Sequence, residues 1–136
     1  MRVLIIDGQG GGIGRALIEQ IRLCLPDLEI LALGTNSAAT ASMLRAGATN
    51  GATGESAILY NCMHCDIIMG PLGILLAHSM LGEISPQIAQ AVSQSPAKKV
   101  LLPISKCHAY VSGVADASIG EHIQDAVRIL KRLLDE

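Results

Sequence analysis

The residues best suited to chemistry lie near the start of the chain, in a glycine-rich stretch between Asp7 and Ala16. A turn that binds phosphate must reverse the chain sharply, approach the ligand without a Cβ, and present the free N–H groups of a helix start. Gly8, Gly12 and Gly14 can meet these three needs in that order. The stretch therefore predicts a phosphate-binding turn, with a purely structural tight turn as the alternative.

The residues expected to hold a cofactor in this turn are Gly8, Gln9, Gly10, Gly11, Gly12, Ile13, Gly14 and Arg15. Asp7 comes directly before them, and we expect its carboxylate to hold the turn through backbone N–H groups rather than to act as an acid or base.

A second set of ligand contacts is expected after the second strand, at Thr35, Asn36 and Ser37. Dinucleotide folds place an acidic residue there to bind the ribose hydroxyls, and this chain has none. Hydroxyl and amide donors suit a 2′-phosphate instead, so the sequence slightly favours NADP over NAD and leaves mononucleotides open. The alternative is that Asn36 and Ser37 only cap the next helix.

The loop after the fourth strand also lies where a ligand would bind. Gly70 and Pro71 end that strand and complete the expected cofactor contacts. His78, Ser79 and Glu83 follow and can face a substrate, or they can simply satisfy the loop backbone.

The cysteines have spacings that metal and redox sites use. Cys62 and Cys65 form a C-x-x-C pair, and Cys107 stands next to His108. A zinc site needs four such ligands within reach, and a redox pair favours a helix start, whereas 62–65 is expected at a helix end. We therefore expect small buried hydrophobes and no metal, with the redox question open.

The elements that position these residues follow from hydrophobic periodicity. Short apolar runs predict strands and spacings of three and four predict helices. The strands are expected at 3–6, 29–33, 66–69, 99–104 and 109–111, and the helices from 13 to 24, 37 to 45, 53 or 54 to 61, 86 to 94 and 119 to 134. Strand and helix alternate, which predicts a single Rossmann-like domain over 1–136: a doubly wound, mostly parallel sheet of about five strands with helices on both faces.

Composition excludes several classes of function. Half of the 136 residues are hydrophobic, the net charge is −2, and the aromatic residues are two tyrosines. Without basic runs or stacking platforms, nucleic-acid binding is not expected. The sequence has no apolar segment long enough for a membrane helix and no signal peptide, so a cytoplasmic location is expected. The high apolar content also predicts a homo-oligomer with an apolar interface. The alternative explanation is a parallel sheet that is covered on both faces within one chain.

Two families resemble this chain, and the first shares its glycine turn. The spacing Gly8-x-x-x-Gly12-Ile13-Gly14 resembles the cofactor turn of short-chain dehydrogenases. That family's Tyr-x-x-x-Lys is missing, since Tyr60 is followed at that distance by His64 and Tyr110 by Val114. This resemblance implies cofactor binding rather than hydride transfer.

The second resemblance spans nearly the full length. The segments 6–14, 32–36, 51–55 and 79–84 are similar to a bacterial family catalogued only as a domain of unknown function. It implies a Rossmann-like domain and no known activity.

The sequence thus favours a nucleotide-binding protein, with NAD or NADP as the expected ligand. Two alternatives stay open: a non-catalytic structural or regulatory subunit with an empty glycine turn, and a small cofactor-dependent reductase with a site at 71–84. Whether the chain is an enzyme, the sequence does not decide.

Overall fold

The computed structural model describes residues 1–104 and 108–136. Its elements are β1 (Val3–Asp7), α1 (Gly12–Cys24), β2 (Ile30–Gly34), α2 (Ser37–Arg45), β3 (Asn50–Thr53), α3 (Glu55–Cys62), β4 (Ile67–Pro71), the short 3-10 helix η1 (Leu72–Leu75), α4 (Pro86–Gln94), β5 (Lys98–Leu102) and α5 (Ile119–Leu134). The five strands form one sheet in the order β3-β2-β1-β4-β5, and every pairing is parallel. The expected Rossmann-like, doubly wound α/β fold is confirmed.

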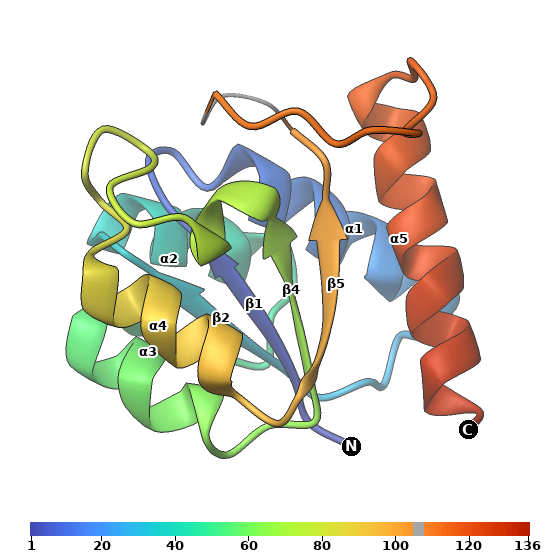
Figure 1. The fold of residues 1–136 in the computed structure, drawn as a ribbon. Helices are drawn as coiled ribbons and strands as arrows, with labels where there is room; N and C mark the ends of the chain where they lie inside the picture. The colour runs from blue at the N-terminus through green and yellow to red at the C-terminus, as the bar shows by residue number, and fades with distance from the viewer. Residues whose placement is uncertain (105–107) are drawn as a thin grey trace.

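The sheet is buried on both faces because alternate residues of each central strand point to opposite sides. Val3 and Ile5 pack in a core with α1, α5 and Met43 of α2. Leu4 and Ile6 pack in a second core, formed with α3 and α4. Figure 1 shows the resulting layers, with α3 and α4 on one side of the strands and α1 and α5 on the other.

Both cores are aliphatic, as the composition requires. The two tyrosines lie outside them, with Tyr60 63% exposed and Tyr110 88% exposed. In the described ranges, no helix combines the length and the apolar character that a bilayer crossing needs.

Helix starts follow local capping rules. The Ser85 hydroxyl accepts a hydrogen bond from the N–H of Ile88, and Pro86 takes the first position of α4, where a missing N–H costs nothing. Ser118 and Glu121 form a capping box at the start of α5.

One predicted strand is absent from the structure, and one observed strand was not predicted. The strand expected at 109–111 is wrong, because these residues pair with no other strand of the described chain. The fifth strand is β3, whose residues Asn50–Thr53 pair with β2 at the sheet edge. This strand lacks an apolar signal because its outer position leaves most of it exposed.

Two boundaries also need correction. Ser37 is predicted to cap α2, but the cap is Asn36, whose side chain accepts from the N–H of Ala39, and Ser37 is the first helical residue. β5 ends at Leu102, so Pro103 and Ile104 lie beyond the strand they are predicted to extend. Proline has no N–H to give to a ladder, which accounts for the earlier end.

Candidate functional site

The order of the strands fixes where a ligand can enter. From β1 the chain goes to β2 and β3 on one side, then returns to β4 and β5 on the other. Ligands of such sheets bind outside the carboxyl ends of the strands at this switch point, here between β1 and β4. The glycine turn after β1 and the loop after η1 both lie along this end of the sheet, at the upper edge of Figure 1.

Asp7 holds the glycine turn by accepting hydrogen bonds from its backbone. Its two carboxylate oxygens accept hydrogen bonds from the N–H groups of Gly8 and Gly14, each at 2.8 Å, and the side chain is buried. Burial raises the pKa of Asp7 more than the N–H groups of Gly14, Gly8 and Ile13 lower it. The carboxylate therefore ties the end of β1 to the start of α1, as expected from its place before the glycines.

Three of the glycines are required by packing. Gly11 has φ +72°, which a side chain disfavours, and a Cβ there would lie 2.9 Å from the backbone of Ala39. A Cβ on Gly8 would lie 2.7 Å from Thr35 Oγ1, and one on Gly14 would strike Met43. These glycines let α1, α2 and the neighbouring loops approach closely.

Gly10 and Gly12 differ from the other three. A Cβ at either position would meet nothing within 4 Å, and both residues are exposed. Their backbone N–H groups donate to no acceptor in the ranges 1–104 and 108–136. This open half of the turn presents the donors that the sequence assigned to a phosphate.

Glu83 occupies the side of the glycine turn that faces the end of β2. Its Oε1 accepts hydrogen bonds from the N–H of Gln9 at 2.8 Å, the hydroxyl of Thr35 at 2.5 Å and the amide of Asn36 at 2.9 Å. Burial acts to raise the pKa of Glu83, but these three donors together outweigh it, so the pKa lies below its ordinary value. A carboxylate thus does stand beside the end of β2, supplied by a distant loop.

In the structure, the residues on which the sequence-based preference for NADP rests have other partners. Thr35 and Asn36 are predicted to donate to a 2′-phosphate, and both donate to Glu83 instead. Ser37 is exposed at the start of α2, and its hydroxyl makes no hydrogen bond within the described chain. A 2′-phosphate at this place would meet a negative charge.

The loop 76–84 that carries Glu83 has an unusual backbone. His78, Met80 and Leu81 have positive φ angles of 69°, 58° and 56°, which non-glycine residues adopt rarely. The loop is fixed by the N–H of His78, which donates to Ile84 O at 2.6 Å, and by the buried Ser79 hydroxyl, which donates to Gly73 O at 2.5 Å. Ser79 therefore satisfies the backbone, which was one of its two expected roles.

A cavity of about 520 Å³ lies at the switch point, next to the open half of the turn. Such a volume is in the range of small-ligand sites. Its walls come from five parts of the chain: the glycine turn, the end of β4 with η1, loop 76–84, Ile104 after β5, and Ile119 at the start of α5. The lining residues are Gln9, Ile13, Pro71, Gly73, Ser79, Met80, Leu81, Ile104 and Ile119.

Two further expected cofactor contacts, Gly70 and Arg15, do not line this cavity at the switch point. Gly70 packs against the backbone of Ile6 inside the sheet, where a Cβ would clash. Arg15 is exposed on α1 and pairs with Glu19 at 3.6 Å.

The cysteine pair has the character of buried hydrophobes. Burial raises the pKa of Cys62 to about 12 and also raises that of Cys65, which disfavours the reactive thiolate. No group of three metal-ligating side chains occurs within the described part of the chain. Cys107 lies outside the described residues.

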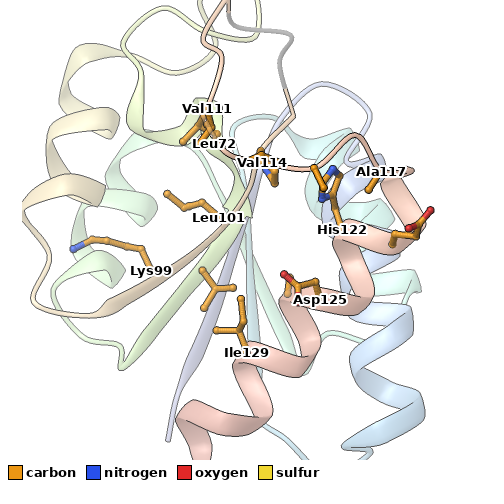
Figure 2. Close-up of a pocket in the computed structure, with 14 residues that line it drawn as sticks. Leu72, Lys99, Leu101, Val111, Val114, Ala117, His122, Asp125 and Ile129 are labelled. Atoms are coloured by element: carbon orange, nitrogen blue, oxygen red, sulfur yellow. The ribbon is translucent and has the colours of Figure 1, made fainter.

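A larger cavity of about 640 Å³ lies between β5, α5 and the segment 111–117, away from the glycine turn. Figure 2 shows its mostly apolar lining, with Lys99 directed away from it. Lys99 donates to Ser95 O, and Asp125 accepts from Arg128. The cavity also carries the acidic side chains of Glu121 and Asp125, which disfavour a phosphate, so it is the weaker candidate.

Sequence reasoning missed two features of the site. It did not foresee that Glu83 reaches Thr35, because 48 residues separate them in the sequence and no local pattern pairs them. It also did not assign Ile104 and Ile119 to the ligand cavity. Only the parallel topology, which gathers strand ends at one edge, could have hinted at either.

Fold and site together define a Rossmann-like α/β domain with a glycine turn at the switch point of its sheet. The chain belongs to the family described as Domain of unknown function (DUF3842), whose model matches residues 2–135. The expected membership of an uncharacterised family is confirmed.

No curated protein matches the chain in sequence. Among solved structures, the chain is similar to a dodecameric FMN-dependent UbiX-like decarboxylase from Escherichia coli O157:H7. The identity is 14%, the TM-score is 0.48, and the match covers 98% of this chain and 94% of that one. A likeness of this size concerns the course of the backbone and carries nothing about a ligand.

Proposed function

We propose that the chain is a nucleotide-binding protein that holds a phosphate on the N–H groups of Gly10 and Gly12. The observation that carries this proposal is that Gly10, in the turn, and Gly12, the first residue of α1, are exposed and that their N–H groups have no partner within the described chain. Helix starts bind anions because such donors and the positive end of the helix dipole act together. The adjoining cavity at the switch point gives the rest of the ligand a place.

The lining of that cavity fits the uncharged part of a nucleotide. Ile13, Leu81, Ile104 and Ile119 supply apolar surface, and Gln9 stands beside the turn. An apolar wall with a few polar groups at one end is the usual composition of a small-molecule site. NAD and NADP remain candidate ligands along with mononucleotides.

A second candidate function is a structural or regulatory subunit whose turn stays empty. The observation that favours it is the negative charge already present, since Asp7 and Glu83 both place carboxylates on the N–H groups of the turn. If these carboxylates are the only anions that the turn binds, the glycines serve packing alone.

Calorimetry on the wild-type protein and on Gly12→Asp separates the two functions. The panel is AMP, ADP, FMN, NAD, NADP and FAD. An aspartate at position 12 meets open space, and its charge favours a helix start, so the fold is retained. The charge would repel a phosphate, and we expect a loss of roughly 30- to 1000-fold in affinity, the scale of a broken charged contact.

The matched control is Gly120→Asp, which places the same charge in the first turn of α5, again with nothing closer than Ser118 Oγ at 3.9 Å. It should bind like the wild type. The nucleotide function is refuted if the wild type binds no panel member below millimolar concentration, or if Gly12→Asp binds as well as Gly120→Asp.

A further inference from the structure

The crevice outside the carboxyl ends of the central strands has two halves: one is an open cavity and the other is filled by side chains. Over β1 and β4 lies the open cavity described above. Over β1 and β2 the space is filled, because a Cβ on Gly8 would lie 2.9 Å from both Glu83 Oε1 and Met80 Sδ. A ligand that spans the crevice needs both halves, since a dinucleotide crosses the turn from one side of β1 to the other.

The closed half is held by charge-assisted hydrogen bonds. Three donors from two separate loops converge on the single Oε1 atom of Glu83: Gln9 N, Thr35 Oγ1 and Asn36 Nδ2. Bonds of this kind are among the stronger ones in proteins. Asn36 adds a bond to Gln9 O at 3.0 Å, which links the same two loops directly. We call these contacts the Glu83 latch.

We propose that the Glu83 latch sets the ligand class of the site: it excludes dinucleotides and restricts binding to a mononucleotide placed over β1 and β4. This inference rests on the proposed nucleotide function and narrows it. Thr35 and Asn36 at the end of β2 already donate to Glu83, and Glu83 and Met80 occupy the space beside Gly8 that a ribose bound there would enter. A dinucleotide must therefore break the latch before it can bind. Its apparent affinity is its intrinsic affinity multiplied by the fraction of molecules in which the latch is open.

Two variants open the latch by different routes. Glu83→Ala removes the acceptor. Asn36→Asp keeps the oxygen that caps α2 through Ala39 N, but it replaces the donor to Glu83 with a like charge. Glu19→Ala, which removes an exposed glutamate from the side of α1, is the matched control.

Calorimetry with AMP and FMN against NAD and FAD measures the effect. In the wild type and Glu19→Ala we expect mononucleotides to bind more tightly than dinucleotides. In both latch variants the ratio should shift towards dinucleotides by about 10- to 100-fold, the scale of losing one hydrogen bond to a charged group. Mononucleotide affinity should change less than dinucleotide affinity, because the N–H groups of Gly10 and Gly12 make no contact with the latch, whereas Gln9 both belongs to the latch and lines the cavity.

A ligand-free readout tests the latch itself. Amide hydrogen exchange at Gln9, an exposed residue whose N–H donates to Glu83, should be slow in the wild type and faster in Glu83→Ala.

The outcomes are distinct. If mononucleotides bind but the ratio is the same in all four proteins, or Gln9 exchanges equally fast in the wild type and Glu83→Ala, the latch inference fails and the nucleotide function stands. If no nucleotide binds to any of the four proteins, the nucleotide function fails and the inference fails with it.

Discussion

Replacing Asp7 by asparagine tests how the glycine turn is held. Asparagine has nearly the same shape, but it offers one acceptor and one NH₂ group where the carboxylate has two acceptors. It can keep the bond to Gly8 or the bond to Gly14, and at the other it turns a donor against a donor. The residue is 4% exposed, so water cannot replace the lost partner.

The expected magnitude comes from three terms. A lost hydrogen bond to a charged group is worth about 1.5–3 kcal/mol, and an unsatisfied buried N–H costs about 1–3 kcal/mol. The neutral amide avoids the burial of a charge, which is the same desolvation that raises the pKa of Asp7. We expect a net destabilisation of roughly 2–3 kcal/mol.

Urea unfolding followed by far-ultraviolet circular dichroism measures this loss, with Asp27→Asn as an exposed control. The slope of free energy against urea should stay constant, so the change appears in the midpoint. If Asp7→Asn unfolds within about 0.5 kcal/mol of the control, the carboxylate is not the tie between β1 and α1 that we describe.

Two further predictions concern charge and assembly. The folded pKa of Glu83 lies below its ordinary value of 4.5, so the ionised Glu83 should stabilise the fold above that pH and lose this effect as the pH falls through the folded pKa. The difference in unfolding free energy between wild type and Glu83→Gln should therefore shrink on acidification. A constant difference from pH 7 to pH 3 would contradict this. The exposed side chains of Leu81, Tyr110 and Ile119, which are 96%, 88% and 52% exposed, predict a homo-oligomer, and a monomer by light scattering at micromolar concentration would refute this.

Much of the fold could be predicted because buried parallel strands are apolar along their whole length. Val3 to Ile6 is such a run, and the glycines after it mark the end of the strand. β3 could not be found in this way, since Asn50–Thr53 is an exposed edge strand with no apolar pattern. The residues 109–111 gave a false strand, because a short apolar run guarantees neither burial nor a pairing partner, and Tyr110 and Val111 are exposed.

The candidate site, like the fold, could be predicted only in part. The position of the glycine turn is a local property and was predictable. The use of each glycine was not, because the close approach of Gly8 depends on Met80 and Glu83 from a distant loop. That loop in turn depends on positive φ angles at His78, Met80 and Leu81, for which these residue types give no signal.

The scarcity of aromatic rings gives the chain a useful optical property. With two tyrosines and no tryptophan, the protein absorbs little in the near ultraviolet, so even a partly occupied nucleotide would dominate the spectrum of the purified protein. The two rings also lie in separate places. Tyr60 is on α3, and Tyr110 is in the segment before α5, where it lines a separate cavity with Ile104 and Ile119, two residues that also line the ligand cavity. A Tyr60→Phe variant would leave Tyr110 as a single natural fluorophore close to the crevice, able to report ligand entry without any attached dye.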